Sequence, residues 1–525
     1  MNLVSYGQQN VILNGNPTKT FFKTSYCQYT NFGLQKFRVD FEGSRTLRLT
    51  EDSVFTFKIP RYADLLMDSY ISFELPHIWS PIYYNTDLSM NIPYEFKWIE
   101  NIGSKMIKKI SITCGNQTLQ EYSGDYLLAS VQRDYTNDKK DLFDKMTGHV
   151  KELYDPGNSG QRSYMYPSTI YTENISGAEP SIRSRTLYIP LNSWFSFKSQ
   201  MAFPLTSLQY NELHITITFR PINELFRIKD VEDALNNFPH VAPNFNNAYM
   251  QFHRFLQSPP TDPITDTTIF PDTRTLWNTD IHLNCTYCFL SNDEARLFAL
   301  QEQKYLFRQV NEKRFTNVTG TNKIDLKSLG MVSSNLFYLQ RSDVNLRNEW
   351  SNYTNWDYNN VIPQEVAFAF DANNNVFYIT GDSTPRNEKD ILLKMAVLLD
   401  GSYRENSQPA GVYNYIEKYT RTQGNAPDGL YCYNYCLNTN PYEIQPSGAI
   451  NMNRFNQVEM EFVTIRPPYD ENAQTKTFCD ENGVIIGINK PTWVIYTYNY
   501  DLVFFEERLN VVTFVGGNCG LMYAT

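Results

Sequence analysis

The chain has 525 residues, a formal net charge of −10, 42% hydrophobic and 15% aromatic side chains, and only 19% charged residues. This composition excludes a disordered chain or a coiled coil. The acidic balance, with no basic run, argues against a coat lying directly on nucleic acid, because phosphate contacts need clustered lysine and arginine. The length is about three to four times that of a common domain, so we expect at least two cores.

The sequence shows no secretory or membrane segment. MNLVSYGQQNVILNG (1–15) lacks the basic and apolar regions of a signal peptide. No stretch approaches the roughly 18 apolar residues that a transmembrane helix needs. We therefore expect synthesis in the cytosol and mostly reduced thiols for the eight cysteines.

The N-terminal stretch GNPTKTFFKTSYCQYTNFG (15–33) is aromatic and shows no helical stripe. Gly15-Asn16-Pro17 predicts a turn in which the proline holds the asparagine extended. We assign residues 1–24 to an arm of the kind that docks on a neighbouring molecule. The alternative, that the two phenylalanines belong to a core, stays open. The candidate assembly residues are Phe21, Phe22, Tyr26 and Tyr29.

Alternation of apolar and polar residues dominates the rest of the chain, as in 46–60, 212–221 and 457–462. This period of two predicts antiparallel strands with one face in solvent. Turn pairs such as Gly115-Asn116 and Asp400-Gly401 separate the strands. The side chains expected to point inward are Leu47, Leu49, Phe55, Phe57, Ile59, Leu213, Ile215, Ile217, Phe219, Val458, Met460 and Phe462.

Two segments have a helical pattern. Residues 291–315 begin with Ser291 and Glu294 at the spacing of a capping box, so we predict one helix there. Residues 124–146 predict a second helix, broken near Thr136-Asn137. Both are expected as insertions between strands and not as layers of an α/β fold.

Prolines divide the chain into two halves. Five of them lie between Pro221 and Pro271, a density that a central strand does not tolerate. We therefore expect a first β domain at 25–222, a proline-rich connector with one short helix at 223–270, and a second, related β domain at 271–525. Asparagine-rich segments of the second domain, 348–361 and 370–390, are expected as long surface loops.

The search for catalytic chemistry finds no motif. Phosphate-binding loops, nucleophile elbows and paired metal-binding histidines are absent from the sequence. Adjacent acids such as Glu51-Asp52 read as solvated turns, although sequence order does not show which acids converge in space. We expect neither an enzyme nor a cofactor.

Cysteine spacing raises the question of a metal site. A zinc site needs four ligands with tetrahedral reach, and residues three apart on a strand point to opposite faces. We therefore expect no metal at His282, Cys285 and Cys288, nor at Cys432 and Cys436.

Five Asn-X-Ser/Thr sequons occur, and without a signal peptide the secretory glycosylation machinery should not reach them. Asn352, in a polar segment, is the single candidate for glycosylation.

Several stretches resemble the major capsid proteins of nucleocytoplasmic large DNA viruses. Their amino-acid sequences resemble mimivirus-like members of that family most. Residues 444–455, IQPSGAINMNRF, are similar to the family's Q-P-S-G-x-x-N-x-S-R-F signature, with Asn453 where the family usually has serine. The opening stretch also departs from the family pattern, at Cys27 and Tyr29. The other matching stretches follow the family's order along the chain: 13–32, 95–127, 188–213 and 500–520.

The resemblance implies an all-β fold of two consecutive eight-stranded jelly rolls with short helical insertions and long surface loops. It further implies a homotrimer that forms one tile of an icosahedral virion shell, contacting neighbouring capsomers and minor capsid proteins. Assembly in a viral factory of the host cytoplasm is expected, above an internal viral membrane and without direct nucleic-acid contact. The alternatives are a carbohydrate-binding or glycan-cleaving β-sandwich protein, or a minor or vertex capsid protein.

Overall fold

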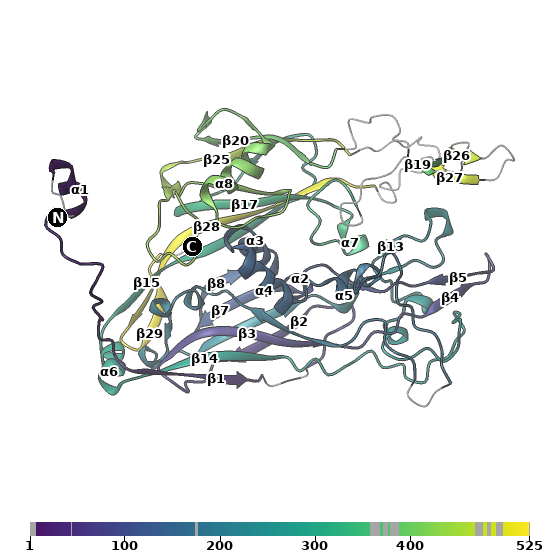
Figure 1. The fold of residues 1–525 in the computed structure, drawn as a ribbon, viewed down its shortest axis with the longest axis horizontal. Coiled ribbons are helices and arrows are strands. Elements are labelled where there is room, and N and C mark those ends of the chain that lie inside the picture. Colours follow the sequence, from purple (N-terminus) through teal and green to yellow (C-terminus); the bar gives the residue numbers. More distant parts are fainter. Residues whose placement is uncertain are drawn as a thin grey trace, which may run out of the picture.

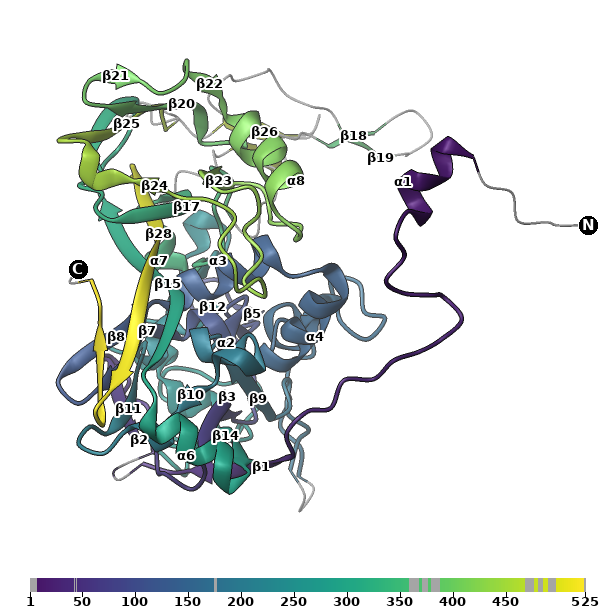
Figure 2. The same ribbon diagram turned by 90° about the vertical axis from the view of Figure 1, so that its left-hand side faces the viewer.

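The computed structural model describes residues 7–523 except 42, 44, 174–176, 358–367, 371–375, 379–387, 468–475, 480–484 and 490–496. Two β-sandwiches are stacked on each other, and an N-terminal arm extends away from them (Figures 1 and 2). None of the helices in the described ranges is long and apolar enough to cross a membrane. The expected surface loop at 370–390 lies mostly outside the described residues.

The first sandwich has two antiparallel sheets, with the strand orders β1-β14-β3-β9 and β2-β11-β7-β8. Counted along the chain as strands one to eight, these orders are 1-8-3-6 and 2-7-4-5, the connectivity of a jelly roll. The strands are β1 (Phe32–Val39), β2 (Ser53–Lys58), β3 (Leu65–Leu75), β7 (Ile107–Cys114), β8 (Gln117–Tyr122), β9 (Arg185–Pro190), β11 (Leu213–Phe219) and β14 (His282–Leu290).

The second sandwich repeats this topology. Its sheets have the orders β15-β28-β17-β23 and β16-β25-β20, the latter continued by β21 and β22, which share the role of fifth strand. The expected double jelly roll is therefore confirmed. The strands are β15 (Gln303–Phe315), β16 (Thr321–Asp325), β17 (Met331–Arg341), β20 (Leu392–Leu399), β21 (Ser402–Tyr403), β22 (Gln408–Pro409), β23 (Leu430–Asn434), β25 (Val458–Thr464) and β28 (Tyr500–Val515).

Alternating burial explains why these segments are strands. In β11, every second side chain from Leu213 to Phe219 is buried, and the residues between them are half-exposed. β2 follows the same pattern, and in β25 Val458, Met460 and Phe462 are buried, although Glu459 between them is buried as well. The predicted inward residues are therefore confirmed except Leu49, which is only partly buried. Each fully buried apolar side chain contributes about 1.5–3 kcal/mol relative to an exposed one.

The expected division of the chain near residue 270 is wrong. Strand β14, placed in the second domain by the sequence, pairs with both β1 and β3 and completes the first jelly roll. The expected connector at 223–270 is an insertion between the seventh and eighth strands. Its β12 (Phe226–Lys229) pairs with β6 (Lys97–Trp98), and Phe226 stacks on Phe96 with ring centroids 4.5 Å apart.

The prolines misled this part of the prediction because the insertion is held by packing of aromatic side chains and by short strands. Instead of one short helix it contains three-residue 3₁₀ turns on either side of β12. The second jelly roll begins only after β14, so the boundary lies in the segment 291–302.

The helix predicted for 291–315 is wrong in its second half. Helix α6 (Asn292–Leu300) ends at Leu300, and β15 follows from Gln303. All thirteen residues of β15 pair with β28, from Gln303 opposite Phe514 to Phe315 opposite Leu502. This long ladder, made with a segment nearly 200 residues away, overrides the local helical pattern.

The helix predicted for 124–146 is confirmed, including its break. Helix α3 (Gly124–Asp134) is capped by Ser123, whose hydroxyl accepts from the backbone N–H of Tyr126, and α4 (Asn137–Thr147) follows. These helices are inserted between the fifth and sixth strands of the first jelly roll. The second jelly roll has an insertion at the same place, the π-helix η10 (Val412–Ile416) followed by α8 (Glu417–Arg421).

The described part of the expected surface loop at 348–361 packs against the first jelly roll. The amide nitrogen of Asn348 donates to the carbonyl oxygens of Asn223 and Phe226, at 2.7 and 2.6 Å. The indole N–H of Trp350 donates to Glu224 at 3.0 Å. The expectation of exposure is wrong here because polar side chains of this segment satisfy backbone groups of the other jelly roll.

Candidate functional site

The N-terminal arm makes almost no contact with the rest of its own chain. It starts with a short helical stretch, η1 (Gln8–Asn10) and α1 (Val11–Asn14), and continues without strand pairing until β1. Every residue from 11 to 31 is exposed, and Figure 2 shows this segment standing clear of both sandwiches. The arm therefore reaches to about residue 31, beyond the expected limit at residue 24.

The side chains of the four candidate assembly residues are exposed to solvent. Phe21 and Phe22 are 105% and 98% exposed, and Tyr26 and Tyr29 are 90% and 89% exposed. The alternative that the two phenylalanines are core residues is wrong for the folded chain. Asn16 also differs from expectation, since its φ of 48° places it in the left-handed region that asparagine tolerates. Four aromatic rings in water form a surface suited to covering by another molecule.

A second feature is the seam, which we define as the contact of α3 with the outer face of the sheet β15-β28-β17-β23. Ala129 of α3 lies in one apolar cluster with Leu336, Tyr338 and Phe505 of that sheet. Figure 1 shows α3 between the two sandwiches. The seam therefore joins the two jelly rolls into one block.

Ionic groups cross the seam without access to water. The Arg133 guanidinium bonds Asp134 at 2.7 Å and Glu507 at 2.7 and 3.1 Å, and all three side chains are at most 2% exposed. The hydroxyl of Tyr126 donates to Glu507 at 2.6 Å, and Ser334 donates to the same carboxylate. Such charges are tolerated in a core only when every partner is present.

The neighbouring groups determine the pKa of the Glu507 carboxyl. Burial alone would raise the pKa of Glu507, but the guanidinium groups of Arg133 and Arg308 outweigh burial and lower that pKa to about 2. Burial raises the pKa of the neighbouring Asp134. Glu507 is therefore a carboxylate throughout the physiological range.

A second buried cluster lies beside the first. The ammonium group of Lys105, at the end of α2 (Ile102–Lys105), donates to Asp125 at 2.7 Å and to the Tyr353 hydroxyl at 3.0 Å. Arg314 of β15 bonds the same Asp125 at 2.9 Å. Each jelly roll thus supplies a partner that the other roll needs.

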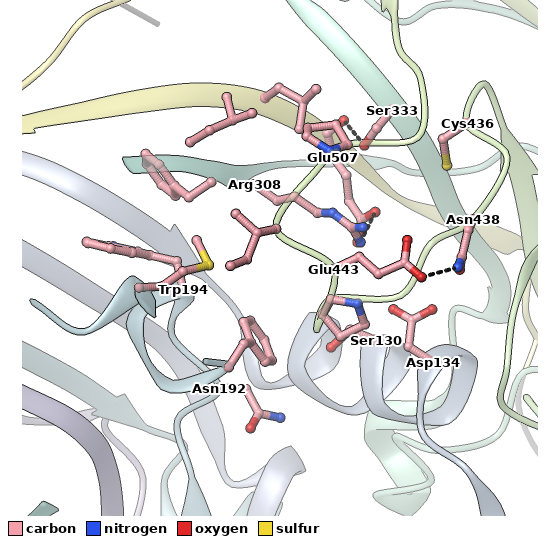
Figure 3. A pocket seen from close by; sticks show the side chains of 18 of the residues that line it. Ser130, Asp134, Asn192, Trp194, Arg308, Ser333, Cys436, Asn438, Glu443 and Glu507 are labelled. Carbon is pink, nitrogen blue, oxygen red and sulfur yellow. Dashed lines mark hydrogen bonds and ion pairs between the residues drawn. The ribbon is translucent and has the colours of Figure 1, made fainter. Parts of the chain in front are cut away.

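A small cavity of about 70 Å³ lies at the seam (Figure 3). Asp134, Trp194, Arg308, Glu443 and Glu507 are among its lining residues. Its acids are already engaged, because Arg133 binds Asp134 and Glu507, and Asn438 donates to Glu443 at 3.0 Å. The arrangement serves to hold two domains together and does not present a free pair of carboxylates for glycoside cleavage.

The candidate glycosylation site is buried. Asn352 is 5% exposed, and its amide nitrogen donates to the carbonyl oxygen of Trp356 at 2.5 Å. A glycan is attached through this nitrogen, so the geometry speaks against glycosylation of Asn352 in the folded chain.

The cysteines lie as the strand argument expects. Cys285 and Cys288 belong to different apolar clusters on opposite sides of β14. Cys432 and Cys436 are buried. Within the described ranges, no three His, Cys, Asp or Glu side chains gather in a way that could hold a metal ion.

Sequence reasoning missed the ionic seam. Arg133 and Glu507 are 374 residues apart in the chain, so no local pattern connects them. The signal that was available is the run LVFFEERLNVV (502–512), in which three charges interrupt an otherwise apolar strand. Charged residues at the centre of a buried strand indicate a paired ionic site.

We expect the free energy of unfolding to fall as pH decreases from about 4.5 to about 2. The folded pKa of Glu507 lies below its unfolded value of 4.5, so the ionised group contributes stability above pH 4.5 that is lost on protonation. Urea unfolding over this pH range measures the effect. The Glu507→Gln variant should be less stable at neutral pH and approach the wild type near pH 2, whereas parallel curves would contradict the assignment.

Two family models match the chain. "Major capsid protein N-terminus" matches residues 20–255, and "Large eukaryotic DNA virus major capsid protein" matches residues 294–520. The chain is 22% identical to "Probable capsid protein 4" of Acanthamoeba polyphaga mimivirus, over 87% of this chain and 91% of that protein. It is also 22% identical to "Major capsid protein" of Phaeocystis pouchetii virus, over 100% and 99% of the two chains.

Solved structures show the same fold. A chain of the PBCV-1 virus capsid matches with a TM-score of 0.61 and 18% identity, over 96% of this chain and 100% of that one. Faustovirus major capsid protein matches with a TM-score of 0.61 and 12% identity, over 94% and 92%. The second family model starts just after β14, in agreement with a second jelly roll that begins there.

Proposed function

Since this chain belongs to the major capsid proteins of large eukaryotic DNA viruses and is a component of the virion capsid, we propose that three copies form one capsomer. The supporting observation is the repeat of the strand orders 1-8-3-6 and 2-7-4-5 within one chain. Two equivalent jelly rolls per chain give six in a trimer, which approximates a hexagonal tile. The ionic seam fixes the angle between the two rolls, as a tile requires.

We further propose that these capsomers contact one another and minor capsid proteins through the arm. Phe21, Phe22, Tyr26 and Tyr29 are exposed in the isolated chain, and so are Val11, Ile12 and Leu13 of α1. An arm that buries nothing in its own chain gains stability only by packing on a neighbour. Many such contacts act at once in a shell, so each one can be weak.

The proposed setting is a shell assembled in a viral factory of the host cytoplasm, around an internal viral membrane. The net charge of −10 supports a position away from the genome, because direct phosphate binding needs positive charge.

The mass of the purified protein in solution tests the proposal. We expect a trimer by light scattering, and a low-resolution image with a six-cornered outline. A pentamer would favour a vertex protein. A stable monomer that cleaves or binds glycans would favour the carbohydrate-active alternative and overturn the proposal.

A further inference from the structure

The seam shows how one jelly roll contacts the next within a chain. Helix α3, inserted between strands five and six of the first roll, covers the outer face of the 1-8-3-6 sheet of the second roll. The covered side chains on that sheet are apolar and almost fully buried: Leu336, Tyr338, Leu430, Cys432, Val503 and Phe505.

Among the residues that the structure describes, none covers the equivalent helix of the second roll in this way. Its outward face carries Tyr415, Ile416 and Tyr419, which are 58%, 56% and 90% exposed. Its inward face is well anchored, since the Tyr413 hydroxyl donates to the carbonyl oxygen of Met395 at 3.0 Å and the Lys418 ammonium donates to that of Pro427 at 3.0 Å. The segment η10–α8 is therefore held in place with three adjacent apolar side chains in water.

In the described part of the chain, the outer face of the equivalent sheet of the first roll is only partly covered. On β1-β14-β3-β9, Tyr188 is 46% exposed and Tyr70 is half-buried. A hollow of about 350 Å³ opens between Asp68, Tyr70 and Pro190 of the sheet and Lys139 and Leu142 of helix α4. Its aromatic rings and polar groups can receive tyrosine rings and pair with their hydroxyls.

Figures 1 and 2 show that the two surfaces belong to different sandwiches of the chain. Helix α8 lies in the second sandwich, near β20 and β25, whereas β1, β14 and β3 lie in the first, and α3 lies between the two. Because Tyr415, Ile416 and Tyr419 are exposed, they do not cover that sheet within the described part of one chain. A second copy with its first sandwich placed against α8 brings the two surfaces together.

We propose that the Tyr415–Ile416–Tyr419 face of one copy docks on the outer face of the sheet β1-β14-β3-β9 of a second copy. The contact repeats between chains the contact that α3 makes within the chain, so it is head-to-tail, and three such contacts related by a threefold rotation form the proposed ring. The inference rests on the proposed trimer and assigns its interface. Aromatic side chains such as Tyr415 and Tyr419 are the usual anchors of such contacts.

The double variant Ile416→Glu/Tyr419→Glu of the full chain tests the contact. We expect the mass in solution to fall from trimer to monomer, with at least a hundredfold weaker association, because two charges are placed in an apolar interface. Thermal melting of the monomer should change little, since both side chains are exposed. The matched control is Leu235→Glu, an equally bare residue (90% exposed) elsewhere on the surface, which should stay trimeric.

A cysteine pair gives a second readout that does not depend on disruption. Tyr188→Cys and Tyr419→Cys are combined in one chain in which Cys27, the exposed cysteine among those described, is changed to serine. Because Tyr188 belongs to the first sandwich and Tyr419 to the second, and both side chains are exposed, mild oxidation should cross-link different copies, up to a covalent trimer.

The outcomes separate the two proposals. A wild-type protein that is monomeric would overturn the proposed trimer. A wild-type trimer that survives Ile416→Glu/Tyr419→Glu and yields no cross-link would overturn this interface and leave the trimer standing.

Discussion

Replacing Arg133 with methionine is expected to lower the free energy of unfolding by about 3–5 kcal/mol, the usual cost of breaking a buried ion pair from one side. The guanidinium of Arg133 forms ion pairs with two buried carboxylates, Asp134 and Glu507. When the guanidinium is removed, these two carboxylates lose their positive partner and repel each other. Methionine fills most of the volume, so the loss reports on charge and hydrogen bonding more than on a cavity. Urea unfolding at neutral pH measures it.

Two controls isolate the pair. Arg183→Met removes an ion pair with Glu179 whose side chains are 78% and 81% exposed, and it should change stability by less than about 1 kcal/mol. The double variant Arg133→Met/Glu507→Gln removes one stranded charge, so it should be more stable than the sum of the two single changes predicts. Additive effects would mean that Arg133 and Glu507 do not act together.

Removing residues 1–31 is expected to reduce the number of complete shells at least tenfold while the capsomer still forms. The stability of the folded chain should stay within about 0.5 kcal/mol, since substitutions at exposed sites rarely do more. Each buried aromatic ring covers about 150–250 Å², so losing four of them per copy removes a large part of the contact between tiles. Electron microscopy of cells in which the variant replaces the natural chain counts the shells.

Substituting the four rings by serine separates their role from that of the chain's length. This variant, with Phe21, Phe22, Tyr26 and Tyr29 changed, should assemble as poorly as the deletion. Deleting only residues 1–14 tests the α1 part of the arm, which we expect to give a weaker defect. Ile269→Ser, which alters a bare residue (87% exposed) outside the arm, is the control. Normal shells from the four-ring variant would refute the assignment.

The strands could be predicted from the sequence because burial of alternate residues is a local pattern, as in Leu213–Phe219. The resemblance to the capsid family supplied the topology. The aromatic arm was also visible, because nothing near Phe21 or Phe22 offers a helical or alternating partner pattern. These features depend on residues close together in the chain.

The remaining features depend on contacts that are distant in the chain. The sequence pattern of β15 predicts a helix, but its pairing with β28 makes it a strand. β14 was assigned to the second domain, but it pairs with β3 of the first jelly roll, more than 200 residues earlier in the chain. The polar segment around Asn352 looked exposed, yet it is buried, and the amide of Asn348 bonds the neighbouring roll. Arg133 and Glu507 had no local signal linking them. Long-range pairing decided each of these cases.

Strand β28 has a consequence for how the chain is made on the ribosome. It is the eighth strand of its jelly roll and is followed only by the short β29 (Asn518–Leu521), but it lies in the middle of its sheet, between β15 and β17. The first sandwich is complete once β14 has emerged, whereas the second has no centre until residues 500–515 are synthesised, on the order of 10–50 s later at about 5–20 residues per second. Throughout that interval the nascent chain exposes an unfinished sheet. A translational stop between β14 and β28 therefore leaves a product with a complete first sandwich and an incomplete, aggregation-prone second one.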